Sequence, residues 1–122
     1  MFRILLVEDE FSVRKMIAVN LMLNGYAVTE AVNGKEAIEL AIENPPDLLI
    51  TDLAMPVQDG TELIYQFKKS DKLKNIPIIV LSAVANLEPV QKLSKWAGAD
   101  TFIQKPFEWP LLSAEINKKL KK

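Results

Sequence analysis

The stretch LLITDLAMP, residues 48–56, contains a short apolar run that ends at a lone carboxylate, Asp52. The run from Leu48 to Thr51 has the length and the β-branched content of a buried strand. Met55-Pro56 follows shortly afterwards and ends the element, because proline cannot donate a hydrogen bond to a sheet. A strand that is apolar on both faces is typical of a parallel sheet covered by helices on both sides. The stretch therefore predicts a central strand, with Asp52 at its end.

Short apolar runs occur at four other places along the chain. They are RILLV (3–7), YAVTEA (26–31), IPIIVL (76–81) and TFIQ (101–104). Between the runs, apolar residues recur at spacings of three and four, which predicts amphipathic helices. The expected inward faces are Val13, Met16, Ile17 and Leu21; Ala37, Ile38 and Ala41; Leu63, Ile64 and Phe67; Val90, Leu93 and Ala97; and Leu112, Ile116 and Leu120.

Residues suited to helix ends stand at the borders of these faces. Asn24-Gly25 is typical of a helix C-terminus, and Pro45-Pro46 ends the second predicted helix. Asp59 and Asn86 are the expected N-caps of the third and fourth helices. The last helix is expected to begin near Phe107.

Five strand–helix repeats of similar length predict an α/β fold, with a doubly wound parallel five-stranded sheet and helices on both faces. The second and fifth runs contain more polar residues than the others, so we expect them at the sheet edges. The flavodoxin-like strand order 2-1-3-4-5 satisfies this condition. A length of 122 residues suits one domain, so residues 1–122 are predicted to form a single unit.

The composition excludes several classes of function. A net charge of −1 gives no electrostatic basis for binding nucleic acid or an anionic membrane. The chain has no cysteine and no histidine, which excludes disulfides, catalytic triads that use histidine, and the usual zinc sites. The first apolar run is too short for a signal peptide or a membrane span. We therefore expect a cytoplasmic protein.

Polar residues follow four of the predicted strands. They are Glu8 and Asp9 after the first, Asp52 after the third, Ser82 after the fourth and Lys105 after the fifth. Taken alone, an acidic residue after a strand is more often a helix cap or a solvated loop residue, and a lone serine or lysine there indicates still less. Ligands in an open parallel sheet bind outside the carboxyl ends of the strands, near the switch in strand order. The shared rim therefore predicts one polar site.

The residue types at this rim restrict its chemistry. Neighbouring carboxylates repel each other unless a cation is present. Oxygen ligands without histidine or cysteine select magnesium, manganese or calcium, and magnesium commonly shares its site with a phosphate oxygen. Lys105 supplies a second positive charge and Ser82 a hydrogen-bond donor. The set suits a phosphoryl group held beside a carboxylate, with Asp52 as the best nucleophile.

Four motifs, VEDE (7–10), DLAMPVQDG (52–60), LSA (81–83) and KPF (105–107), occur in an order and spacing that strongly resemble the receiver domain of two-component response regulators. The resemblance covers essentially the whole chain, and the chemotaxis regulator is the simplest member of that family. The combination of motifs is specific, although each motif alone is weak.

The resemblance implies a metal site and a phosphoacceptor. Glu8 and Asp9 match the acidic pair that holds Mg²⁺, with Mn²⁺ as an alternative ion, Asp9 directly and Glu8 through water. Asp52 matches the phosphoacceptor, which also contacts the metal. Ala54 is expected to offer its backbone carbonyl as a further ligand. Its side chain departs from the polar residue found there in many receivers, which leaves the lifetime of the phosphate open.

The resemblance also implies a switch. Ser82 matches the switch hydroxyl, Lys105 the lysine that pairs with the acyl phosphate, and Phe102 the aromatic switch residue on the fifth strand. Ser82 is expected to move inward after phosphorylation, and Phe102 to rotate into the vacated space. This change would remodel the surface of the fourth helix, fifth strand and fifth helix. A cis peptide is expected at Lys105-Pro106.

The implied partners are a histidine kinase or a histidine phosphotransfer protein as donor, and an output domain or protein downstream. A phosphorylation-dependent homodimer is a further expectation, whereas neither nucleic acid nor a membrane is expected to bind this domain. Such a receiver catalyses its own phosphorylation and dephosphorylation without being a conventional enzyme.

The same residues argue against two alternative functions. A haloacid-dehalogenase-type phosphatase needs a second aspartate where Ala54 stands, and a flavodoxin needs a phosphate-binding loop where EDEF (8–11) would repel phosphate. A pseudo-receiver, an interaction module that is not phosphorylated, is the remaining alternative. Plain packing remains an equal explanation for Phe102 and the better one for Trp96 and Trp109. Asp47, Asp59 and Asp100 are interpreted as structural.

Overall fold

The computed structural model describes residues 1–52, 60–82 and 99–120, which form a parallel sheet with helices on both faces. The strands are β1 (Arg3–Val7), β2 (Ala27–Ala31), β3 (Leu48–Asp52), β4 (Ile78–Ser82) and β5 (Thr101–Gln104). The helices in these ranges are α1 (Phe11–Leu23), α2 (Gly34–Glu43), α3 (Gly60–Lys69) and α5 (Trp109–Leu120). The strand order is β2-β1-β3-β4-β5, as predicted, with β2 and β5 at the edges.

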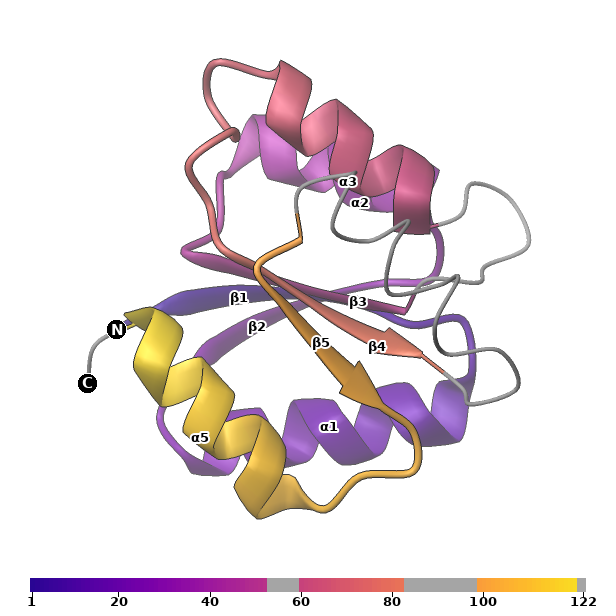
Figure 1. Cartoon of the computed structure of the whole chain (residues 1–122), viewed down its shortest axis with the longest axis vertical. Coiled ribbons are helices and arrows are strands. Elements are labelled where there is room, and N and C mark those ends of the chain that lie inside the picture. The colour runs from indigo at the N-terminus through magenta and orange to yellow at the C-terminus, as the bar shows by residue number, and fades with distance from the viewer. Residues whose placement is uncertain (53–59, 83–98, 121–122) are drawn as a thin grey trace.

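The helices cover the sheet in two layers. Helices α1 and α5 lie on one face, and α2 and α3 lie on the other (Figure 1). Side chains of a strand alternate between the faces, so Ile4 and Leu6 pack toward α1 and α5, while Leu5 and Val7 pack toward α2 and α3. Full burial of one such side chain stabilises the fold by about 1.5–3 kcal/mol.

The central strands are the most deeply buried part of the molecule. Every residue of β3 and β4 is buried, and in β1 only the first residue, Arg3, is exposed. The predicted inward faces of α3 (Leu63, Ile64 and Phe67) and α5 (Leu112, Ile116 and Leu120) are buried as well. The apolar runs in the sequence therefore identified the core.

The predicted inward face of α1 was wrong at one position. Met16 is 53% exposed, whereas the buried residues of the helix are Arg14, Ile17, Ala18 and Leu21. These four residues still have the spacing of one helical face, but one of them is the charged Arg14 and not an apolar residue. An arginine can lie inside only when its guanidinium finds partners, and Arg14 has two of them, described with the site below.

The C-termini of α1 and α2 lie where the sequence predicted them, just before Asn24-Gly25 and Pro45-Pro46, and α2 also has an N-cap that was not predicted. Gly25 has a φ of +89°, in the left-handed region, and its N–H donates to the carbonyl of Met22. The Tyr26 N–H donates to the carbonyl of Leu21, which completes a Schellman motif. At the start of α2, the Asn33 side chain accepts a hydrogen bond from the Glu36 N–H at 2.8 Å.

Some predicted boundaries differ from the structure by one or two residues, most of all at the starts of β4 and α5. Strand β4 begins at Ile78, two residues later than expected, because Pro77 has no N–H to donate to its neighbour. Helix α5 begins at Trp109, two residues after Phe107.

Several expectations fall on residues outside the described ranges and stay predictions. They are the cap at Asp59, the fourth helix with its inward face, and the packing of Trp96. The contribution of Ala54 belongs with them. Within the described ranges, none of the helices has both the length and the apolar content needed to cross a membrane.

Candidate functional site

Strand pairing brings the candidate residues to one edge of the sheet. Val7 pairs with Thr51, so Glu8 and Asp52 are the next residues on two adjacent parallel strands. Asp52 in turn pairs with Leu81, the residue before Ser82. All these positions lie at the carboxyl ends of the strands, beside the switch in strand order between β1 and β3.

Three acidic side chains meet at this edge. Glu8, Asp9 and Asp52 each offer a carboxylate oxygen, and these oxygens lie within 4.8 Å of one another. Glu8 and Asp52 are buried, whereas Asp9 is exposed. Hard oxygen donors at this spacing fit a magnesium or manganese ion, and the exposed side of the cluster leaves room for the waters that Mg²⁺ retains.

Lys105 reaches into the acidic cluster from the end of β5. Its Nζ lies 2.5 Å from Glu8 Oε1 and 3.2 Å from Asp52 Oδ2. The Lys105 N–H donates to the carbonyl of Ser82 at 2.7 Å, which fixes the backbone of the lysine against β4. The Lys105-Pro106 peptide is cis, as expected. The lysine therefore bridges two of the three carboxylates.

The ionisation of the Glu8–Lys105 pair reflects burial and close contact. Burial raises the pKa of Glu8 above its ordinary value of 4.5, although hydrogen bonds from Lys105 and from the Glu10 N–H oppose this. Burial alone would lower the pKa of Lys105, but the carboxylates of Glu8 and Asp52 outweigh it and raise that pKa. The lysine is therefore held in its charged form, while the buried glutamate bears an electrostatic penalty.

The two predicted switch residues lie on β4 and β5. Ser82 is the last residue of β4, is 7% exposed and pairs with Gln104 of β5. Phe102 lies on the edge strand β5 and is partly buried against the core cluster beneath α2 and α3. Both positions agree with the predicted placement, and the switch roles stay predictions. The structure also brings together the other predicted site residues that it describes, Glu8, Asp9, Asp52 and Lys105.

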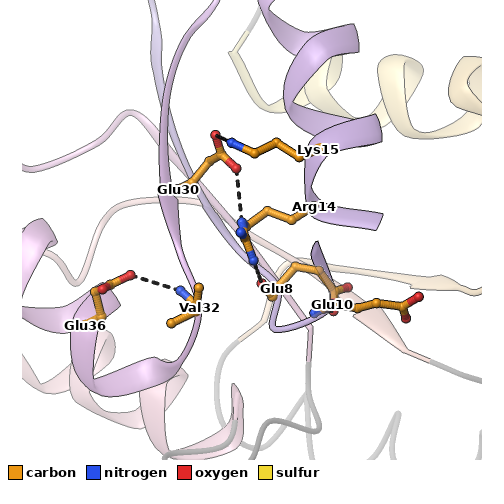
Figure 2. Close-up of polar contacts among 7 residues, drawn as sticks. All are labelled: Glu8, Glu10, Arg14, Lys15, Glu30, Val32 and Glu36. Atoms are coloured by element: carbon orange, nitrogen blue, oxygen red, sulfur yellow. Dashed lines mark hydrogen bonds and ion pairs between the residues drawn. The ribbon is translucent and has the colours of Figure 1, made fainter. Parts of the chain in front are cut away.

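One residue that contacts the acidic turn, Arg14, was not predicted from the sequence. Arg14 Nη1 donates to the backbone carbonyl of Glu8 at 3.0 Å, and Arg14 Nε donates to Glu30 Oε1 at 3.0 Å (Figure 2). The sequence contained a signal for this contact. Arg14 has helical spacing with the apolar residues Ile17, Ala18 and Leu21, and the adjacent predicted strand YAVTEA contains a glutamate that could pair with it.

Comparison with known proteins gives a consistent result. Residues 4–117 match the model of the response regulator receiver domain. The chain is 37% identical over 120 residues to the phosphate regulon transcriptional regulatory protein PhoB of Pseudomonas aeruginosa, covering 98% of this chain and 52% of that protein. The chain spans about half the length of most of the curated relatives it matches.

Solved structures are similar along nearly the whole chain. A putative response regulator from Chloroflexus aurantiacus superposes with a TM-score of 0.93 at 30% identity, covering 99% of this chain and 98% of that one. The receiver domain of sensor histidine kinase PA1611 from Pseudomonas aeruginosa, whose structure has a magnesium ion coordinated in the active site cleft, gives 0.90 at 28% identity, with 99% and 98% covered. The chain therefore belongs to the response regulator receiver domain family of two-component systems.

Proposed function

We propose that Asp52 is the phosphoacceptor of this domain and receives a phosphoryl group from a phosphohistidine of a histidine kinase or a histidine phosphotransfer protein. The observation that supports this most directly is the position of Asp52. Its carboxylate lies beside those of Glu8 and Asp9 and accepts a hydrogen bond from Lys105 at 3.2 Å. Membership of the family supports the general reaction, and the geometry of this cluster supports the assignment of its residues.

Glu8, Asp9 and Asp52 are the side chains that would hold Mg²⁺, with Mn²⁺ as an alternative, and the Ala54 carbonyl is a further expected ligand. When bound, the ion offsets the charge of the carboxylates and of the incoming phosphoryl oxygens. The magnesium ion in the structure of the PA1611 receiver supports this assignment. The donor chemistry of the three carboxylates supports it independently.

The transfer exchanges one bond to phosphorus for another. An oxygen of Asp52 forms the new P–O bond as the P–N bond to the donor imidazole breaks, and the imidazole nitrogen leaves with the electron pair. Lys105 stabilises the negative charge of the phosphoryl oxygens, and the Ser82 hydroxyl donates a hydrogen bond to one of them. The work of the site is therefore positioning and electrostatic stabilisation.

Phosphorylation has a consequence at the surface. Ser82 at the end of β4 moves toward the phosphoryl group, and Phe102 on β5 turns inward. The surface of the expected fourth helix, β5 and α5 then changes its preference for an output domain, an output protein or a second copy of the chain. We place this signalling in the cytoplasm.

Incubation with acetyl phosphate and MgCl₂, followed by intact-mass analysis, tests the proposal. The wild-type chain should gain the mass of one phosphoryl group, and Asp52→Asn should gain none. Omission of Mg²⁺ with EDTA present should abolish the gain. A wild-type chain that gains no phosphate, or an Asp52→Asn variant that gains as much, would favour the pseudo-receiver alternative.

A further inference from the structure

Arg14 links three parts of the molecule that surround the acidic turn. It extends from α1, donates from Nη1 to the carbonyl of Glu8 after β1, and donates from Nε to Glu30 on β2, as Figure 2 shows. Its side chain is only 11% exposed. A buried arginine with two aligned partners has a fixed geometry, because its planar guanidinium presents its donors in a rigid fork.

The carbonyl that Arg14 holds lies where strand pairing stops. The Glu8 N–H still donates to the carbonyl of Ala31 of β2 at 3.1 Å, so the ladder reaches this residue. The Glu8 carbonyl accepts its hydrogen bond from the arginine side chain instead. The peptide units on both sides of Glu8 are thereby held, the one before it through the Glu8 N–H and the one that joins it to Asp9 through the Glu8 carbonyl. Its orientation sets the directions in which the Glu8 and Asp9 side chains leave the backbone.

Glu30 supports the arginine and also matches its charge. Its Oε1 accepts from Arg14 Nε at 3.0 Å, and its Oε2 accepts from Lys15 Nζ at 2.9 Å. Burial raises the pKa of Glu30, but the hydrogen bonds from Lys15 and Arg14 outweigh burial and lower it below 4.5. Glu30 is therefore ionised at neutral pH. Because the guanidinium has a carboxylate partner, Arg14 influences the acidic cluster mainly through the hydrogen bond to the Glu8 carbonyl.

We propose that Arg14, held by Glu30, is a positioning residue that orients the Glu8–Asp9 turn for divalent-cation binding. The inference rests on the proposed function of the site, because it assigns the residue that supports the metal ligands. Arg14 itself contacts neither the ion nor the phosphoryl group in this assignment. Outer groups that orient metal ligands typically affect metal affinity by about 10- to 100-fold when they are removed.

Magnesium titration of the full chain by calorimetry is the first test. Arg14→Lys retains a positive charge but cannot reach two acceptors with one rigid fork, so we expect Mg²⁺ affinity to fall by about tenfold or more. Glu30→Ala should reduce the affinity in the same direction. Glu30→Gln, which retains an acceptor oxygen for Arg14 Nε, should recover part of it.

Lys15→Ala is the matched control. Lys15 is the neighbouring cation on α1, contacts the same Glu30, and is 46% exposed. It makes no hydrogen bond to Glu8 among those found in the described residues. Its removal should leave Mg²⁺ affinity unchanged. An equal loss of affinity in Lys15→Ala and Arg14→Lys would overturn the proposal, since it would show that the hydrogen bond from Arg14 to the Glu8 carbonyl is not what sets the affinity.

Amide hydrogen exchange in the absence of metal is the second test. The Glu10 N–H donates to Glu8 Oε2 at 3.2 Å, so exchange at Glu10 reports the order of the turn. Arg14→Lys should accelerate exchange at Asp9 and Glu10, while Lys15→Ala should not. A merely structural role for Arg14 would lower the unfolding free energy without changing exchange in this turn.

The outcomes separate the two proposals. If the wild-type chain binds no Mg²⁺, the proposed function and the role in cation binding both fail, and the exchange measurement still decides whether Arg14 holds the turn. If the wild type binds Mg²⁺ and folded Arg14→Lys binds it equally well, only the positioning role fails. Should Arg14→Lys fail to fold, the comparison of Glu30→Ala with Glu30→Gln decides, because equal Mg²⁺ affinity in those two would contradict the proposal.

Discussion

Acidic residues stand at both ends of the parallel sheet, and the fold uses them differently. At the amino ends, Asp47 Oδ2 accepts a hydrogen bond from the Arg3 N–H at 2.7 Å, while the Asp47 N–H donates to the Arg3 carbonyl at 2.8 Å. Asp100 forms the same reciprocal pair with Ile78, at 2.8 and 3.0 Å. Each of these carboxylates is matched to a backbone N–H that starts a neighbouring strand.

At the carboxyl ends, the acidic residues face one another instead. The oxygens of Glu8, Asp9 and Asp52 lie within 4.8 Å, and the ammonium group of Lys105 contacts two of these residues. A backbone amide is a permanent partner, whereas a lysine can be exchanged for a metal ion or can turn to a phosphoryl group. The carboxylates at the amino ends therefore support strand pairing, whereas those at the carboxyl ends carry the metal binding and phosphorylation proposed above.

The largest expected effect separates the two ends by their chemistry. Asp52→Asn should abolish phosphorylation by acetyl phosphate, because the amide is not a nucleophile for phosphorus. Asp47→Asn makes the same chemical change at the other end and should be phosphorylated like the wild type. Intact-mass analysis over a time course measures both. Loss of phosphorylation in Asp47→Asn would show that the amino end also contributes to the reaction.

The next effect is the stabilisation of the carboxyl end by metal. A ligand that binds only the folded chain raises the unfolding free energy by about 2.7 kcal/mol at a concentration of 100 times its dissociation constant. Urea denaturation with and without saturating MgCl₂ should show this gain in the wild type. Asp9→Ala should lose most of it, and Asp47→Ala should retain it. An unchanged gain in Asp9→Ala would remove Asp9 from the metal site.

The sequence was sufficient to predict the sheet and the edge on which the site lies. The runs at β1, β3 and β4 are almost entirely apolar, and buried parallel strands leave few other interpretations. Once the strand order is known, the carboxyl ends of the strands must share one edge. The convergence of Glu8, Asp52 and Lys105 therefore follows from topology, before any side-chain geometry is known.

The partners of individual charged groups could not be predicted in the same way. Arg14 was absent from the predicted inward face of its helix, because the spacing of apolar residues does not take charged residues into account, yet it is buried. The close contact of Lys105 with Glu8 depends on side-chain lengths and rotamers, which spacing along the chain does not contain. The start of β4, in contrast, could have been predicted correctly, because Pro77 has no N–H to donate and the strand begins at the next residue, Ile78.

The pH dependence of stability offers a finer comparison within the site, in the absence of metal. The pKa of Glu8 is raised in the folded chain, so its contribution to the unfolding free energy falls as pH rises from 4.5 through the folded value. Relative to the wild type, Glu8→Gln should therefore gain stability as pH rises through this window. The gain is about 1.4 kcal/mol for each unit by which the pKa is raised.

Glu30→Gln is the control, with the opposite sign. The pKa of Glu30 is lowered, so its stabilising contribution is present above 4.5 and is lost as pH falls through the folded value. Relative to the wild type, this variant should lose stability as pH rises from the folded pKa of Glu30 to 4.5. Urea denaturation between about pH 3 and 7, bracketing the usual glutamate pKa, measures both series. Parallel pH curves for the two variants would contradict the assigned shifts.

The smallest effect concerns the amino ends alone. Asp100→Ala removes the acceptor of the Ile78 N–H, a partly buried hydrogen bond, and should lower the unfolding free energy by about 1 kcal/mol. Asp47→Ala should cost less, because its bond to Arg3 is exposed and water can replace the carboxylate. Neither variant should change Mg²⁺ affinity in calorimetry. A weaker magnesium site in Asp100→Ala would show that the start of β5 helps to place Lys105 at its other end, and that the two ends of the sheet are coupled.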